Sequence, residues 1–250
     1  GGSAENRMRF PLELLAELRK TLGPDFAIEY RISGDEVDEQ GMRIEDTVAF
    51  LERAQEYIDL VHISAGIDPS NHERRFNPSY MEPHNVNAEC AALAKMRLHI
   101  PVAVVGGISY HEDAERMIAD GMTDMVSIGR ATICDPEGHK KAELGLEEEI
   151  RPCLRCGHCG RASRAMGTKT TLCAVNPTAC RELQYMNILP APVKKRIMIV
   201  GGGPAGMQAA ITACQRGHEV ELYEASDRLG GLLHTASALA FKADMPRYVA

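Results

Sequence analysis

The sequence predicts an α/β protein in two parts that are joined by a cysteine-rich segment, and three observations support this fold class. Short apolar segments alternate with amphipathic ones through the first half of the chain. Four of the eight cysteines lie between Cys153 and Cys173, and a glycine-rich turn follows an apolar segment that ends at Val200. With 250 residues, 44% of them hydrophobic, the chain is long enough for one large domain or parts of two.

The first half alternates predicted helices with predicted strands. Apolar residues at helical spacing predict helices at Leu12–Leu22, Asp46–Tyr57, Asn85–His99 and His111–Ala119. Short apolar runs predict strands at Phe26–Ile32, Asp59–Ser64, Pro101–Val105 and Asp124–Ile128. This alternation without a hairpin signal is typical of a parallel sheet, either open and doubly wound or closed into a (β/α)8 barrel.

The residues at the predicted strand ends favour the barrel. Arg31, the segment 62–66, Gly106-Gly107 and Gly129-Arg130 lie at or just past the carboxyl ends of the strands, where barrel enzymes place their chemistry. The last two pairs also suit the phosphate site that the loops after the final two barrel strands form. We therefore expect strands five to eight of a barrel and regard the chain as a fragment.

A second α/β unit is predicted after the pattern breaks at Asp135-Pro136. A charged stretch, the cysteine-rich segment and a linker come first. The second unit consists of a strand at Arg196–Val200, a turn at Gly201–Gly206, a helix at Met207–Arg216 and a strand at Glu219–Tyr223. We accordingly divide the chain into residues 1–145, 146–193 and 194–250.

Composition excludes several classes of partner. The formal net charge of −7 and the lack of any basic run argue against nucleic acid. The sequence has no apolar stretch of about 18–20 residues and no signal segment, which argues against a membrane and for the cytoplasm. We expect a small-molecule substrate and leave homo-oligomer formation open.

The cysteine-rich segment predicts a metal centre. Cys153, Cys156 and Cys159 form a tight triplet, and Cys173 follows after a loop. Soft thiolate ligands select an iron–sulfur cluster or zinc, and a triplet with one remote ligand favours [4Fe-4S] over the paired cysteines of structural zinc sites. Zinc and no metal remain alternatives, and Cys180 is the rival fourth ligand. Cys90 and Cys214 lie on helical patterns and are expected to be buried.

The glycine-rich turn predicts a dinucleotide site. Gly201 permits a tight turn, Gly203 lets the backbone approach a pyrophosphate, and Gly206 permits close packing of helix on strand. Glu224 ends the next predicted strand at the distance expected for a carboxylate that binds a ribose, and Gly230-Gly231 follows. An acidic residue at this position indicates a ribose without a 2′-phosphate.

The candidate residues of the first half are less specific one by one. Arg31 is a cation within an apolar strand, so it requires either an anionic or hydrogen-bonding ligand or a salt bridge such as one to Glu29. Gly106-Gly107 and Gly129-Arg130 offer backbone amides and a guanidinium to a phosphate. His72 is a tentative catalytic residue, as a proton donor or a substrate clamp.

The motifs and their order resemble one known family. They are GGSAENRMRF, YRIS, HISAG, VVGGI, DMVSIGRATICDPE, RPCLRCGHC, CAVNP and GGGPAG. Together they resemble the flavin/iron–sulfur branch of the old yellow enzyme family, which includes 2,4-dienoyl-CoA reductase, trimethylamine dehydrogenase and the enoate reductases. The resemblance covers essentially the whole chain. It implies a barrel that holds FMN, a [4Fe-4S] cluster beside it, and an FAD module that accepts electrons from NAD(P)H.

The resemblance also implies residue roles. Arg31 would contact the flavin pyrimidine, and Gly106-Gly107 with Gly129-Arg130 would bind the FMN phosphate. The FAD site would comprise Gly201, Gly203, Gly206, Glu224, Gly230 and Gly231, and the cluster ligands would be Cys153, Cys156, Cys159 and Cys173. His72 is similar to the substrate-side histidine of the dienoyl-CoA reductases. The two-residue spacing between Cys156 and Cys159 departs from those reductases and matches the trimethylamine dehydrogenase type.

The implied activity is an NAD(P)H-dependent ene-reductase. Electrons would pass from NAD(P)H to FAD, then through the cluster to FMN, and finally to an activated C=C bond such as that of an enoate, dienoyl-CoA or enone. An amine dehydrogenase that passes electrons outward is the alternative enzyme, and an incomplete, inactive fragment is the alternative of a different class. We expect the chain in isolation to be inactive, because it would comprise only half of the barrel, and the resemblance implies that the family's proton-donating tyrosine lies before Gly1.

Overall fold

The first half of the chain forms a parallel α/β layer structure. The computed structural model describes residues 2–66, 77–160, 167, 171–185 and 187–249. Within them, four strands pair in parallel in the order β1-β2-β3-β4. These strands are β1 (Glu29–Ser33), β2 (Leu60–Ser64), β3 (Val102–Val104) and β4 (Met125–Val126). The predicted α/β class is confirmed, and all four predicted strands are present, although β4 is short.

The helices fall into three groups along the chain. Those associated with the four-stranded sheet are α1 (Ala4–Leu22), α2 (Ile44–Ala54), α3 (Ala88–Lys95) and α4 (His111–Ala119). The elements of the central segment are α5 (Arg130–Cys134), α6 (Gly138–Glu143), the 3-10 helix η1 (Glu147–Glu149) and α8 (Glu182–Tyr185). The last part contains α9 (Pro204–Gln215), α10 (Leu232–Ala236), the 3-10 helix η2 (Ala240–Lys242) and α11 (Asp244–Val249).

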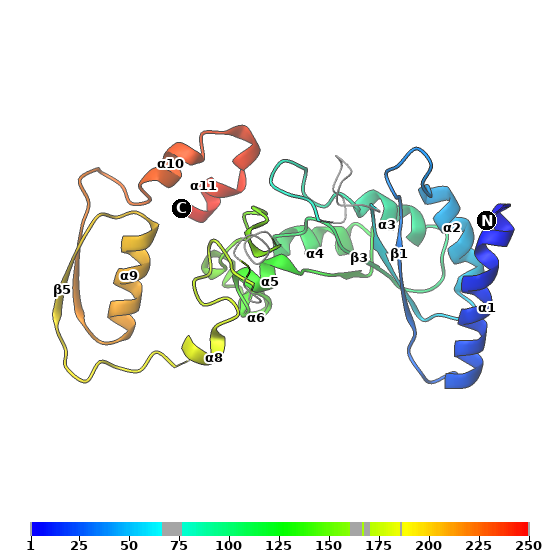
Figure 1. Ribbon diagram of the computed structural model, residues 1–250, viewed down its shortest axis with the longest axis horizontal. Coiled ribbons are helices and arrows are strands. Elements are labelled where there is room, and N and C mark those ends of the chain that lie inside the picture. Colours follow the sequence, from blue (N-terminus) through cyan, green and yellow to red (C-terminus); the bar gives the residue numbers. More distant parts are fainter. Residues whose placement is uncertain (1, 67–76, 161–166, 168–170, 186, 250) are drawn as a thin grey trace.

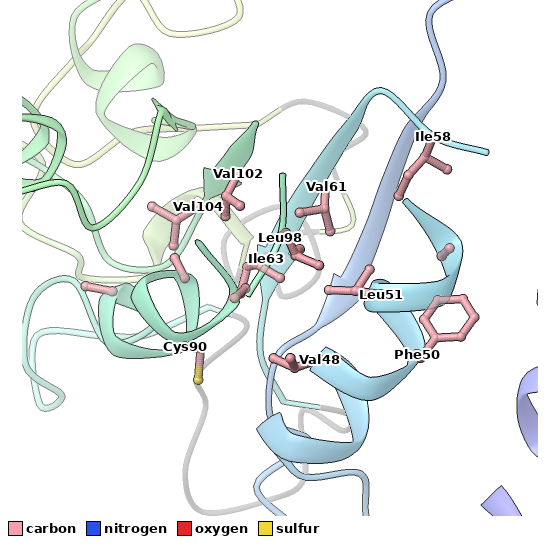
Figure 2. Packing of buried hydrophobic residues seen from close by; sticks show 14 of the residues in the cluster. Val48, Phe50, Leu51, Ile58, Val61, Ile63, Cys90, Leu98, Val102 and Val104 are labelled. Carbon is pink, nitrogen blue, oxygen red and sulfur yellow. The ribbon is translucent and has the colours of Figure 1, made fainter. Parts of the chain in front are cut away.

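The core lies between the strands and helices α2 and α3. Strand residues alternate between the two faces of a sheet, and Val61, Ile63, Val102 and Val104 all belong to the apolar cluster on the helix side. Figure 2 shows Leu51 of α2 pointing toward β2 within this cluster. Each such fully buried aliphatic side chain contributes about 1.5–3 kcal/mol to stability. The opposite face of the sheet, on which Glu29, Arg31 and His62 lie, is not covered by these helices and can carry polar groups. We call it the inner face.

Helix α1 begins earlier than the sequence predicted. It starts at Ala4 rather than Leu12, because the Ser3 hydroxyl accepts a hydrogen bond from the backbone N–H of Asn6 at 3.3 Å and caps the helix. Pro11 lies inside the helix. The prediction was wrong because the residues between the cap and Leu12 are mostly polar in their first turn and include Pro11, so they show no clear helical period of apolar residues.

Helix α3 begins later than predicted, at Ala88 instead of Asn85. Asn85 has a φ of 56° and is therefore left-handed, so it cannot belong to the helix. The side chain of Asn87 donates a hydrogen bond to the carbonyl of Val105 at 2.6 Å, which ties the start of α3 to the end of β3.

The last part of the chain contains a second, two-stranded parallel sheet. Strand β5 (Arg196–Val200) pairs with β6 (Glu219–Tyr223), and both bounds match the prediction. Figure 1 shows β5 and α9 at the opposite end of an elongated molecule from α1, with α5 and α6 between them. The strands are exposed at alternate residues, for example Met198 and Val200. None of the described helices is long and apolar enough to cross a membrane.

Candidate functional site

Four predicted cysteine ligands line one pocket. Cys153, Cys156, Cys159 and Cys173 border it together with Cys134 and the apolar side chains Ile133, Leu154 and Val175. Cys180, the rival fourth ligand, is exposed and lies outside this pocket. Among the described residues, no group of three His, Cys, Asp or Glu side chains is placed to hold a metal ion. The structure therefore brings the four predicted thiols to one place.

The thiols of the pocket differ in acidity. Interaction with the neighbouring Cys134 thiol lowers the pKa of Cys153 to about 7 and the pKa of Cys173 to about 6. Burial raises the pKa of Cys156 and Cys159. Two sulfurs thus favour the thiolate form, which is the form that binds soft metals.

Cys90 and Cys214 were both expected to be buried. Cys90 lies on α3 and is buried in the main core, as predicted. Cys214 is exposed on α9, so that prediction was wrong. Helical spacing on α9 does not reveal which face is covered, and the described part of the chain does not cover this one.

The two predicted phosphate loops leave the same edge of the sheet. Val104 of β3 is the register partner of Val126 of β4, and Gly106 and Gly129 follow these residues by two and three positions. The Nη1 atom of Arg130 is buried and has no hydrogen-bond partner among the described residues. A buried donor of this kind fits a phosphate oxygen, so the residues present suit a phosphate-bearing cofactor.

Gly106 and Gly107 are also required by local packing. They have φ values of 145° and 69°. A Cβ on Gly106 would lie 2.3 Å from Nδ2 of Asn87, and one on Gly107 would lie 2.9 Å from Cγ of Pro78. The tight turn after β3 therefore depends on glycine whether or not a ligand is bound.

The inner face of β1 and β2 carries a contact between two polar side chains that the sequence did not predict, although the segment 62–66 was expected at a strand end. His62 is 8% exposed, and its Nδ1 lies 2.9 Å from Oε1 of Glu29. Its Nε2 is buried without a partner in the described part of the chain. The register that pairs Arg31 with His62 places all three side chains on this face.

Arg31 is less buried than the sequence predicted. It is exposed rather than enclosed, and within the described residues its one hydrogen bond is to Oγ of Ser64, from Nη2 at 3.4 Å. The salt bridge to Glu29 does not form, because Glu29 contacts His62 instead. An exposed guanidinium on the inner face remains available to a ligand. His72, the tentative catalytic residue, lies outside the described residues.

The predicted dinucleotide loop has the geometry that its glycines require. Gly201 has a φ of 106°, and a Cβ on Gly206 would lie only 1.9 Å from the carbonyl oxygen of Gly201. A Cβ on Gly203 would meet no atom within 4 Å, so the loop is open on that side. Gly230 donates to the carbonyl of Gly202 at 2.8 Å, which brings the second glycine pair against the first turn.

Glu224 anchors the same loop. Its Oε2 accepts from the backbone N–H of Gly202 at 2.7 Å, and its Oε1 accepts from the backbone N–H and the hydroxyl of Ser226 at 2.9 Å. Hydrogen bonds from the backbone of Ser226 and Gly202 lower the pKa of Glu224 to about 2. The carboxylate is thus ionised and fixed beside the turn, with lone pairs left for a ribose hydroxyl.

A buried carboxylate near the end of the chain contacts the cysteine segment. Asp244 is 5% exposed and accepts from Nε2 of His84 at 2.7 Å, from the hydroxyl of Tyr110 at 2.8 Å and from Nε of Arg155 at 3.3 Å. Arg155 lies between Cys153 and Cys156 and also donates to the carbonyls of Glu82 and Pro83. The Asp244 contact therefore joins α11, the cysteine segment and the loops after β2 and β3. Sequence analysis missed it.

A parallel sheet with two glycine loops at one edge is followed along the chain by a pocket of thiols and by a glycine-rich turn of the dinucleotide-binding type. The chain belongs to the NADH:flavin oxidoreductase / NADH oxidase family, which it matches over residues 1–149. Residues 199–247 match an NAD(P)-binding Rossmann-like domain.

The chain is also similar to individual proteins of this kind. The chain is 43% identical over 248 residues to an NADH oxidase from Thermoanaerobacter brockii, covering 97% of this chain and 37% of that protein. It is similar to 2-naphthoyl-CoA reductase in complex with 2-naphthoyl-CoA, with a TM-score of 0.90, 28% identity and coverage of 100% of this chain and 38% of that one. For histamine dehydrogenase from Rhizobium sp. 4-9 the TM-score is 0.86 at 28% identity, with coverage of 100% and 36%. The chain thus spans less than two fifths of each.

Proposed function

We propose that the protein carrying this chain is an NAD(P)H-dependent flavin oxidoreductase that reduces an activated C=C bond, such as that of an enoate, a dienoyl-CoA or an enone. In this proposal, residues 1–145 are strands five to eight of a (β/α)8 barrel that holds FMN. Residues 146–193 hold a [4Fe-4S] cluster, and residues 194–250 begin the domain that holds FAD. The order of electron transfer is NAD(P)H, FAD, cluster, FMN and then the alkene.

The observation that supports the proposal is that the thiol pocket is linked to both neighbouring parts of the chain. On one side, Arg130 of the phosphate edge lines the pocket. On the other side, Arg155, which also lines it, is bonded to Asp244 of α11. These contacts support a one-electron carrier between two flavins, because such a carrier must lie close to both flavin-binding parts.

The residues divide among the three groups by their chemistry. The guanidinium of Arg130 and the amides of Gly106, Gly107 and Gly129 suit the FMN phosphate, and Arg31 on the inner face suits the flavin ring. The turn at 201–206, Glu224 and Gly230-Gly231 suit FAD. Cys153, Cys156, Cys159 and Cys173 suit the cluster. The flavins supply hydride transfer, and the cluster supplies single-electron transfer.

The chain's own residues shape these sites before any group binds. Ile133, Leu154 and Val175 form apolar walls that limit water around the thiols. Arg130 and Arg151 provide positive charge that favours the thiolate forms of Cys153 and Cys173 respectively. One ring nitrogen of His62 contacts Glu29, and the other, Nε2, is buried without a partner among the described residues. This second nitrogen can form a hydrogen bond with a ligand on the inner face.

The test is a cofactor and turnover analysis of the protein purified anaerobically from its native gene. We expect one FMN, one FAD and four irons with four acid-labile sulfides per subunit. We also expect NAD(P)H oxidation that depends on a cinnamate-type or enoyl-CoA acceptor. Zinc without sulfide, or NAD(P)H oxidation that no alkene stimulates, would contradict the proposal.

An amine dehydrogenase is the second candidate, because the structural similarity to histamine dehydrogenase spans the whole chain. In that case, a primary or methylated amine would reduce the flavin, and electrons would leave to an artificial acceptor. Anaerobic mixing with histamine and with methylated amines distinguishes the two functions. Bleaching of the flavin absorbance by an amine in the absence of NAD(P)H would favour the dehydrogenase.

A further inference from the structure

The thiol pocket contains five cysteines, one more than a [4Fe-4S] cluster uses. Cys134 ends α5, is 2% exposed and lines the pocket with the four proposed ligands. Its Sγ lies 3.5 Å from Sγ of Cys173. The two sulfurs are within hydrogen-bonding distance, so the fifth thiol is part of the site and not a distant core residue.

The position of Cys134 is fixed from both arms of the cysteine segment. Arg151, which precedes the triplet, donates from Nη1 to the carbonyl of Cys134 at 3.3 Å and from its backbone N–H to Asp135 at 3.0 Å. Asn176, which follows Cys173, donates to the carbonyl of Ile133 at 2.9 Å. The end of α5 is therefore clamped between the two arms, and the thiol has little freedom to turn away.

We propose that Cys134 is a positioning residue whose S–H group donates a hydrogen bond to the ligand sulfur of Cys173 and raises the reduction potential of the cluster. This inference rests on the proposed function, because it requires a cluster in the pocket. Four cysteines complete the ligand set, so the fifth keeps its proton and acts as a donor.

The direction of the effect follows from charge. Reduction adds a negative charge to the cluster and its ligand sulfurs, and a donor that points at one of these sulfurs stabilises the reduced form more than the oxidised form. Removing the donor should shift the potential to a more negative value. A buried S–H group has a larger effect than an exposed one, because water does not compete for the same sulfur.

Two substitutions separate hydrogen bonding from packing. Cys134→Ala removes the donor, and Cys134→Ser keeps a donor on a shorter side chain. Cys214→Ala is the matched control, because Cys214 is exposed on α9, outside the pocket. All three are compared with the unmodified holoprotein by iron and sulfide analysis and by potentiometric titration of the cluster monitored by EPR.

We expect full iron and sulfide in every variant, a negative shift of the cluster potential in Cys134→Ala, a smaller negative shift in Cys134→Ser and none in Cys214→Ala. An unchanged potential in Cys134→Ala would overturn the inference, and so would loss of iron from that variant, which would make Cys134 a ligand. Unmodified protein without iron and sulfide would overturn the proposed function as well, so the two failures are distinguishable.

Discussion

The carboxylate of Asp244 lies 3.3 Å from Nε of Arg155, although 88 residues separate them in the chain. Both side chains are buried, at 5% and 4% exposure. Arg155 belongs to the cysteine motif, and Asp244 begins α11, so this ion pair joins the dinucleotide-binding part to the thiol pocket.

Asp244→Ala should detach α11 from the cysteine segment. The substitution leaves Arg155 buried without a carboxylate to balance its charge. Breaking a buried ion pair in this way lowers the opening free energy by about 3 kcal/mol. Hydrogen exchange of the amides in α11 should rise accordingly. Glu112→Gln is the control, since it breaks the half-exposed ion pair with Arg247 and should change the opening free energy of α11 by less than about 1 kcal/mol. Equal effects of the two substitutions would contradict a dominant role for Asp244.

The same contact should weaken in acid. Burial would raise the pKa of Asp244, but hydrogen bonds from His84 and Tyr110 outweigh it and hold the pKa below its ordinary value of 3.8. Because the folded pKa is depressed, the stabilisation is complete above the unfolded pKa and is lost as the pH falls through the folded one. Exchange protection of α11 should therefore persist from pH 5 to 7 and fall below about pH 4. Asp244→Asn should remove this step, and a step that persists in the variant would assign it to another group.

Substitution of the cysteines should distinguish those that bind the cluster from those that do not. Cys153→Ser and Cys173→Ser should each lower the iron and sulfide content, because both thiols line the pocket. Cys180→Ser should leave the cluster absorbance intact, since Cys180 is exposed and lies outside the pocket. Bleaching by the Cys180 substitution would mean that the fourth ligand had been assigned wrongly.

Glu224→Ala should lower FAD retention and leave FMN bound. The substitution removes the acceptor that fixes Gly202 and a carboxylate that can bind the ribose hydroxyls. Glu221 lies on β6, the strand that ends just before Glu224, and Glu221→Ala breaks an exposed ion pair with Arg196, so it is the matched control and should retain both flavins. Equal loss of the two flavins from the Glu224 variant would refute the assignment.

Arg31→Ala should lower the potential of FMN. Its guanidinium on the inner face has only a long contact with Ser64 among the described residues, so it is free to stabilise the reduced flavin. A charged hydrogen bond worth about 1.5–3 kcal/mol corresponds to a shift of about 30–60 mV for a two-electron couple. Arg31→Lys should recover part of the shift, because lysine lacks the planar fork. Potentiometry that finds an unchanged FMN potential would limit Arg31 to a structural role.

Periodicity in the sequence was sufficient where one local signal dominates. The bounds of α4, β5 and β6 match their predictions, because each has a clear apolar pattern between turn residues. The start of α1 could not be found this way, since the Ser3 cap precedes polar residues. The start of α3 depends on the left-handed conformation of Asn85, which the helical pattern does not reveal.

The parts of the candidate site that lie close together in the sequence could be predicted from the spacing of their residues. The thiol triplet and the 201–206 turn are both encoded in neighbouring residues, and the structure brings each together. The Asp244 contact and the Glu29–His62 pair join residues that are far apart in sequence, so no local pattern indicates them. Cys134 was overlooked because it lies on a helix outside the motif spacing.

The linker before β5 is where the composition of the sequence suggests a boundary between exchangeable modules. The side-chain contacts cross this boundary. Asp244 lies after the linker in the sequence, but the three side chains that donate hydrogen bonds to it lie before the linker. A chimera that joined this chain to a relative's dinucleotide-binding module at the linker would bring a foreign residue against His84, Tyr110 and Arg155. Such chimeras should therefore keep α11 in place best when the incoming module also supplies a carboxylate at the start of α11.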